Sequence, residues 1–228
     1  TIIKKERLQP GIGSSLSDFK PEKLATALIE GVELKKDNLT RFLSKERYAI
    51  EPLHNFFFTR DASVAMLDRV LISRMASRIR DRETLIMDTI FRNHPDFGVK
   101  TIQPEHSQHF CKDFSFEGGD FLVAREDILL IGTGGRTTSQ GIDFILEYYR
   151  HKKVQRHIIV QELPYEPESF IHLDMVFTFL DRNQCMVYEP LILQPNRYLT
   201  IHINIDNGKV KSIREVDNIP TVLKELGM

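Results

Sequence analysis

A pair of aspartates seven positions apart recurs three times along this chain, and each aspartate stands beside a run of apolar residues. The leading aspartates lie 59 and 54 residues apart. A repeat of about fifty residues is typical of similar modules arranged around an axis. It also predicts that acidic side chains gather at one place, because each module brings an aspartate to a matching position. The three pairs are Asp61 with Asp68, Asp120 with Asp127, and Asp174 with Asp181.

The composition argues against several classes of partner. The 228 residues carry a formal net charge of -1, with 41% hydrophobic and 28% charged residues, as in an ordinary globular protein. This charge gives no field that would hold a nucleic acid or an anionic membrane, and no apolar stretch approaches the length of a membrane span. Two cysteines, Cys111 and Cys185, cannot build a disulfide framework. We therefore expect a cytoplasmic protein without nucleic-acid or membrane partners.

Residues 1–53 are predicted to form a helical segment. Pro21 suits the first position of a helix and Gly31 suits the position after its end. A second, shorter helix is expected from Asp37 to Lys45. From residue 54 the apolar period changes to two, which is typical of strands. The change predicts a boundary, with three modules over residues 54–228.

Each module is predicted to run strand, strand, helix, strand, which gives an α/β (α+β) fold. In the second module, for example, a hairpin precedes a helix and a returning strand. The expected elements are strands at Asn55–Thr59, Val64–Ser73 and Val99–Gln103 around a helix at 82–93; strands at Phe121–Ala124, Ile128–Gly132 and Arg156–Glu162 around a helix at Ser139–Arg150; and strands at Val176–Leu180, Cys185–Tyr188, Leu199–Ile205 and Val210–Val216 before a helix at Ile219–Leu226.

Two acidic motifs could carry chemistry. The glycines between Glu117 and Asp120 allow a tight turn just before a strand, which would expose both carboxylates. His172 and Asp174 stand two residues apart, so they would share one face of a strand. Carboxylates gathered in a cleft repel one another unless a cation lies between them, and that cation could be a guanidinium or a metal. A metal held by His172, Asp174 and Glu117 is one alternative, although no second histidine has a familiar zinc spacing.

Two arginines could hold an anionic group. The loop Gly132–Thr137 superficially matches a phosphate-binding loop, but it lacks the third glycine of the dinucleotide fingerprint and the Lys-Ser/Thr of a P-loop. It would instead present Arg136 at the mouth of a cleft. Arg80 precedes the helix of the first module in a comparable place. Two such guanidinium groups could hold a substrate carboxylate through paired hydrogen bonds.

With these residues assembled, the chain resembles an arginine deiminase of the guanidino-group-modifying, or pentein, superfamily. The resemblance implies a ring of five strand-strand-helix-strand modules with an inserted helical region, of which this chain would hold the helical segment and three modules. It rests on Asn55-Phe56-Phe57-Phe58-Thr59-Arg60-Asp61, Arg80 with Glu83-Thr84, Phe116-Glu117-Gly118-Gly119-Asp120, Gly132-Thr133-Gly134-Gly135-Arg136-Thr137, and His172-Leu173-Asp174-Met175-Val176-Phe177-Thr178.

The resemblance implies hydrolysis of arginine to citrulline and ammonia through a cysteine-bound amidino intermediate, without metal or other cofactor. Carboxylates would orient the guanidinium beside a thiolate, and an acid-base pair would move protons. The implied roles are guanidinium binding by Asp61 and Asp174, proton transfer by Glu117 and His172, carboxylate binding by Asn55, Arg80 and Arg136, and support of the Glu117 turn by Asp120.

The chain departs from the family pattern at both ends. The family's first module and its C-terminal cysteine motif are not matched, and Cys111 and Cys185 suit buried or incidental thiols better than nucleophiles. We therefore expect a fragment, inactive by itself, or a chain completed by an assembly partner. A homo-oligomer is one candidate assembly. The alternatives are a non-catalytic module that binds a guanidino ligand, and another superfamily enzyme such as an amidinotransferase or a dimethylarginine hydrolase.

Overall fold

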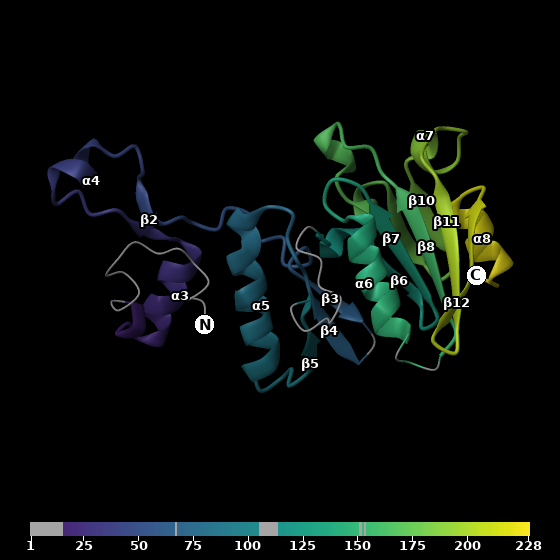
Figure 1. Ribbon diagram of the computed structural model, residues 1–228, viewed down its shortest axis with the longest axis horizontal. Coiled ribbons are helices and arrows are strands. Elements are labelled where there is room, and N and C mark those ends of the chain that lie inside the picture. The colour runs from purple at the N-terminus through teal and green to yellow at the C-terminus, as the bar shows by residue number, and fades with distance from the viewer. Residues whose placement is uncertain (1–15, 67, 105–113, 151, 153) are drawn as a thin grey trace.

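The N-terminal segment lies apart from the other elements in the computed structural model, at the left of Figure 1. The structure describes residues 16–66, 68–104, 114–150, 152 and 154–228. Two helices, α3 (Pro21–Ile29) and α4 (Leu39–Leu43), occur where helices are predicted. Between and after them lie two short strands that the sequence analysis did not predict, β1 (Val32–Glu33) and β2 (Tyr48–Ile50), which pair antiparallel.

This segment has a small core of its own and is tied to the rest by an arginine. Leu16, Ala27 and Ile50 form the buried centre of that core. Arg82, which begins the next long helix, donates from Nη1 to the carbonyl oxygens of Leu28 and Glu51, both at 2.9 Å. One buried guanidinium therefore joins the end of α3 and the residue after β2 to the first module.

The first module begins with a turn region, and its hairpin differs from the predicted one. The stretch Val64–Ser73 was expected to be one strand, but it holds two strands that pair with each other. The module contains β3 (Ser63–Met66), β4 (Arg69–Ile72), α5 (Asp81–Asn93) and β5 (Lys100–Ile102), and its sheet has the order β3-β4-β5. The stretch Asn55–Thr59 was expected to be a strand, and that prediction is wrong. It forms consecutive turns, in which the carbonyl oxygen of residue 55 accepts a hydrogen bond from the amide of residue 58.

The second module has every predicted element. Its hairpin consists of β6 (Phe121–Arg125) and β7 (Ile128–Thr133), and the helix α6 (Ser139–Arg150) leads to β8 (Arg156–Glu162), which is parallel to β7. This crossover is the expected solution for joining two parallel neighbours. The apolar side chains of β7 and β8 are almost all buried, because both faces of the sheet are covered.

The third module has its predicted strands and helix, but the strands are divided between two sheets. Its hairpin, β9 (Phe177–Asp181) and β10 (Gln184–Val187), forms a separate two-stranded sheet. The strands β11 (Thr200–Asp206) and β12 (Lys209–Val216) instead extend the sheet of the second module, in the order β12-β11-β8-β7-β6. Among the described strands no sheet closes on itself, so the structure shows a mixed α/β fold without a complete ring.

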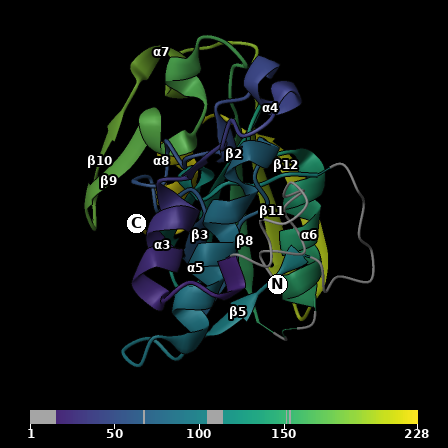
Figure 2. The same cartoon turned by 90° about the vertical axis from the view of Figure 1, so that its left-hand side faces the viewer.

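Both faces of the five-stranded sheet are covered by other elements (Figures 1 and 2). On one face α6 buries Ile142, Ile145 and Leu146 in a core that β3 and β4 also reach. On the other face lie β9, β10, α7 (Glu189–Ile192) and α8 (Ile219–Glu225). Strand β11 joins this sheet because Ile203 and Ile205 extend the core beneath α6. This pairing depends on distant residues, and no local sequence pattern specifies it.

The seven-residue spacing of the aspartates is explained by three hairpins. Each leading aspartate stands before the first strand, and each second aspartate stands at or beside the turn that follows it. Asp68 is exposed near Lys152 and Asp127 pairs with Arg125, so the second members are solvated turn residues. Only the leading members are turned toward the protein interior. Within the described part of the chain, no helix is long and apolar enough to cross a membrane.

The close approach of α6 to the preceding chain gives a first prediction. A Cβ at Gly141 would lie 2.3 Å from the carbonyl oxygen of Ser115. Gly141→Ala should therefore destabilise the fold by ~1–3 kcal/mol, although alanine is the better helix former by about 1 kcal/mol. Urea denaturation would measure this, with Asp143→Ala on the exposed side of α6 as the control. A Gly141→Ala protein as stable as the natural one would show that α6 can shift freely.

Candidate functional site

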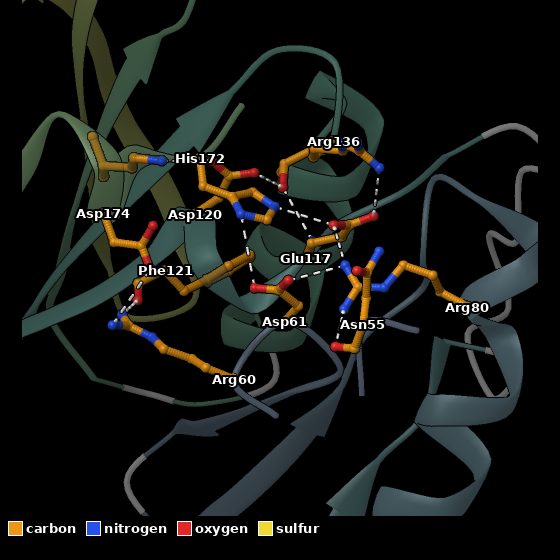
Figure 3. Close-up of polar contacts among 12 residues, drawn as sticks. Asn55, Arg60, Asp61, Arg80, Glu117, Asp120, Phe121, Arg136, His172 and Asp174 are labelled. Atoms are coloured by element: carbon orange, nitrogen blue, oxygen red, sulfur yellow. Dashed lines mark hydrogen bonds and ion pairs between the residues drawn. The ribbon is translucent and has the colours of Figure 1, made fainter. Parts of the chain in front are cut away.

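Three loops that are far apart in the sequence bring acidic and basic side chains together (Figure 3). Asp61 comes from the turns before β3. Glu117 precedes a short 3-10 helix, η3 (Gly118–Asp120), and His172 precedes another, η5 (Leu173–Met175). Every one of these residues is buried. The structure thus gathers side chains from all three hairpin starts at one place.

Two glycines make this convergence sterically feasible. A Cβ at Gly118 would lie 1.8 Å from the carbonyl oxygen of Arg60, and a Cβ at Gly119 would lie 2.4 Å from Nδ1 of His172. The amide of Gly118 also donates to the carbonyl oxygen of Asp61 at 2.9 Å. The Glu117 turn therefore packs directly against the other two loops, which only residues without a side chain permit.

Glu117 and His172 form the central pair. His172 Nε2 lies 3.1 Å from Glu117 Oε2, and the amide of Ala76 donates to Oε1 at 2.9 Å. Burial opposes ionisation of Glu117, but the bonds to His172 and Ala76 outweigh burial and lower its pKa. Burial likewise opposes charging of His172, yet the bond to Glu117 and the charges of Asp120 and Asp61 raise its pKa. The two shifts together favour a carboxylate beside an imidazolium.

Asp61 is shared between a histidine and an arginine. Its Oδ1 lies 3.7 Å from Nδ1 of His172, while Oδ2 accepts from Nη1 of Arg80 at 2.9 Å. Arg80 ends the 3-10 helix η1 (Arg78–Arg80) and is only 8% exposed. It also donates from Nη2 to Glu83 at 2.8 Å. The guanidinium predicted to hold a substrate carboxylate is thus already held by two carboxylates of the chain.

Asn55 and Arg136 lie at the edge of this cluster. Arg136 Nη1 is 4.0 Å from Glu117 Oε1, and its side chain is partly exposed. Asn55 is exposed, and its carbonyl oxygen lies 3.5 Å from Arg80 Nη2. Both residues are therefore near the central pair and accessible from solvent, whereas Arg80 is enclosed.

Asp174 lies beside the central pair but does not bond to it. It sits within η5, and its side chain faces Arg60, whose Nη1 is 3.7 Å from Oδ2. Burial raises the pKa of Asp174, and the nearby Arg60 and His172 oppose that rise. Arg60 had no predicted role, although it stands directly before Asp61 in the same motif. Its adjacency to a candidate acid was the only sequence signal.

Asp120 joins the Glu117 turn to the loop that carries His172. Its carboxylate is fully buried and accepts hydrogen bonds from the hydroxyl of Thr137 and, at 3.0 Å, from the amide of Leu173. Burial raises the pKa of Asp120 to about 7, against the opposing influence of His172 and of these bonds. The residue next to His172 is thereby fixed to the Glu117 turn.

Asp61, Glu117 and His172 have a spacing that could suit a metal ion. Ligand atoms of Asp61, Glu117 and His172 all lie within 4.8 Å of one another. However, Arg80 Nη1 already lies 2.9 Å from Asp61 and 3.7 Å from Glu117. A divalent ion would be repelled by this fixed charge. We therefore keep the prediction that the protein uses no metal at this place.

The structure describes Cys185 but not Cys111. Cys185 is a partly buried residue of β10, and burial raises the pKa of its thiol, which disfavours the reactive thiolate. Cys111 lies outside the described residues.

The central pair predicts a specific titration. Glu117→Gln should lower the pKa of His172, because the neutral amide no longer favours the imidazolium. In the natural protein, the pair stabilises the fold until pH falls through the depressed pKa of Glu117 or rises through the raised pKa of His172. NMR titration of the His172 ring would test this, with Asp206→Asn as a distant control. An unchanged His172 pKa in Glu117→Gln would contradict the pairing.

The buried Asp120 predicts a graded loss of stability. Asp120→Ala leaves the Leu173 amide and the Thr137 hydroxyl without their acceptor, at about 1–3 kcal/mol for each group. Asp120→Asn keeps one oxygen acceptor and should cost less. Because the folded pKa is raised, stabilisation by Asp120 is present below about pH 4 and is lost as pH rises toward about 7. Urea denaturation across this range should show that slope in the natural protein and less of it in Asp120→Asn.

Comparison with known proteins agrees with the motifs. A family model described as arginine deiminase matches residues 23–226. The arginine deiminase of Listeria monocytogenes serotype 4a (strain HCC23) is 31% identical over 197 residues, which cover 82% of this chain and 47% of that protein. The arginine deiminase of Listeria innocua serovar 6a is 29% identical over 230 residues, which cover 90% of this chain and 55% of that protein. The chain thus spans about half the length of these relatives.

Solved structures give partial matches. ArgZ, an arginine dihydrolase from cyanobacteria, is 24% identical with a TM-score of 0.48, covering 62% of this chain and 21% of that one. DDAH from Pseudomonas aeruginosa is 20% identical with a TM-score of 0.44, covering 60% of this chain and 49% of that one. The sequence match over nearly the whole chain decides the assignment: the protein belongs to the arginine deiminase family.

Proposed function

We propose that this chain supplies the guanidinium-binding and proton-transfer groups of a hydrolase that converts L-arginine to citrulline and ammonia. The observation that carries the proposal is the buried Glu117–His172 pair, with Asp61 and Asp174 beside it. A guanidinium is a planar cation that carboxylates bind through paired hydrogen bonds. Membership of the arginine deiminase family supports the same class of substrate.

In the proposed reaction, a thiolate bonds to the guanidinium carbon and one C–N bond breaks. The departing nitrogen takes a proton from His172 and leaves as ammonia, so an amidino group remains on sulfur. His172 then removes a proton from water, whose oxygen bonds to the same carbon as the C–S bond breaks. The product is citrulline, and the remaining hydroxyl proton is released to solvent. Glu117 favours the imidazolium that begins the cycle.

The two acids and the basic residues have separate proposed roles. Asp61 Oδ1 and the carboxylate of Asp174 face the ligand, because Oδ2 of Asp61 is taken by Arg80. Arg136 and Asn55 hold the α-carboxylate from the solvent side. Arg80 contributes positive charge to that end rather than a free pair of donors, since Asp61 and Glu83 already occupy it.

The nucleophile in this proposal is not a residue of this chain. Cys185 has a raised thiol pKa and lies in a hairpin strand rather than in one of the three converging loops. The isolated chain should therefore bind arginine without forming citrulline. The alternative function, a module that binds a guanidino ligand without catalysis, predicts the same binding by the isolated chain. The two functions differ in whether citrulline forms once a thiol is supplied.

Ligand binding gives the decisive prediction. L-arginine should bind to the isolated chain, and Asp174→Asn should weaken binding by about 10-fold to 100-fold, because a charged hydrogen bond contributes ~1.5–3 kcal/mol. Isothermal titration calorimetry would measure this, with Asp206→Asn as the matched control. Agmatine, which lacks the carboxylate, should bind more weakly than arginine.

The activity assay has an equally clear outcome. Citrulline should not accumulate when the chain is incubated with arginine. Citrulline formation that disappears in Cys185→Ser or Cys111→Ser would overturn the proposal that the nucleophile lies elsewhere. Equal binding of arginine by the natural chain and Asp174→Asn would overturn the role of Asp174.

A further inference from the structure

Each of the two acids proposed to bind a guanidinium already faces an arginine of this chain. Arg80 Nη1 lies 2.9 Å from Asp61 Oδ2, and Arg60 Nη1 lies 3.7 Å from Asp174 Oδ2 (Figure 3). An incoming guanidinium of the same chemistry must therefore compete with an internal one. The two internal arginines differ in how readily they can be displaced.

Arg80 is a fixed partner. Its side chain is enclosed, and Glu83, itself almost fully buried, accepts hydrogen bonds from its Nε and Nη2. Moving this guanidinium would leave the buried Glu83 without its charged partner, which is strongly destabilising. Ligand binding therefore has to leave the Asp61–Arg80 contact in place.

Arg60 is a displaceable partner. Its side chain is 50% exposed, Asp174 is 28% exposed, and their 3.7 Å separation is longer than a hydrogen bond. An ion pair whose arginine is half exposed and whose atoms are this far apart contributes little to stability. The guanidinium can therefore leave Asp174 for water at low cost.

The backbone that carries Arg60 is fixed, so only its side chain can move. The carbonyl of Arg60 packs against Gly118, whose amide bonds to the carbonyl of Asp61. The guanidinium has a second attachment, because Nη2 donates to the carbonyl oxygen of Phe121 at the start of β6. Arg60 thus joins the loop of Asp61 to the loops of Glu117 and Asp174, and it is the exposed member of that network.

We propose that Arg60 is a specificity-determining gate: its guanidinium holds Asp174 in the free protein and is displaced by a ligand guanidinium that can make paired hydrogen bonds to that carboxylate. This inference rests on the proposed function. A cation that makes one contact gains little over Arg60 itself, whereas a planar guanidinium that makes two can replace it. The gate therefore disfavours simple ammonium ligands at Asp174.

The test compares Arg60→Gln and Arg60→Lys with the natural chain. Arg60→Gln removes the competing charge, so L-arginine and methylguanidinium should both bind about threefold to fivefold more tightly, the range for an exposed ion pair. Arg60→Lys keeps the charge and should remain near the natural affinity. The gain in Arg60→Gln should shrink at high ionic strength, because salt screens the exposed pair. Arg197→Gln, at an exposed arginine beside Tyr198, is the control.

A ligand-free measurement separates this role from a merely structural one. In a carbon-13 NMR titration, the Asp174 carboxyl should titrate at higher pH in Arg60→Gln than in the natural chain, with Arg60→Lys in between. Thermal melting establishes that each variant folds. Unchanged or weaker binding of both cations by folded Arg60→Gln, or an unmoved Asp174 titration, overturns the gate alone. Absence of binding by the natural chain and by Arg60→Gln overturns the proposed function, and the gate with it.

Discussion

The ionised state of Glu117 is the constraint on which the rest of this site depends. A fully buried carboxylate is costly unless hydrogen bonds and opposite charges compensate for its lost hydration. His172, the Ala76 amide and two nearby arginines provide that compensation. The imidazolium beside Glu117 is therefore part of the folding energetics as well as a candidate proton donor. Any change to this pair should affect stability and proton transfer together.

The geometry of the three loops follows from the need to bring that pair together. Gly118 and Gly119 let the Glu117 turn touch the loops of Asp61 and His172. Asp120 accepts a hydrogen bond from the amide of Leu173, the residue after His172. These close contacts fix the turns against one another, so the acids project from turns that are packed together. Such preorganisation is what a site needs in order to orient a resonance-stabilised cation.

Positive charge is distributed unevenly around the acids. Arg80 is enclosed and permanently paired, whereas Arg60 and Arg136 are accessible and more loosely held. The negative charges of the site are therefore nearly balanced in the free protein. The site can still exchange one internal guanidinium for an external one. A monovalent organic cation fits that exchange better than a divalent metal, because the enclosed arginine cannot leave.

The sequence by itself determined the hairpins of the second and third modules, the rest of the second module and the acidic cluster. Alternating apolar residues and turn residues are local signals, so β6, β7, α6 and β8 lie where they were expected, and the leading aspartates converge as the repeat predicted. Only the tertiary structure decided that Asn55–Thr59 forms turns, that β11 and β12 join the sheet of the second module, and that Arg80 pairs with Asp61 and Glu83. Strand partners and ion pairs depend on which distant segments meet, and burial then fixes which arginine is enclosed and which remains free to move.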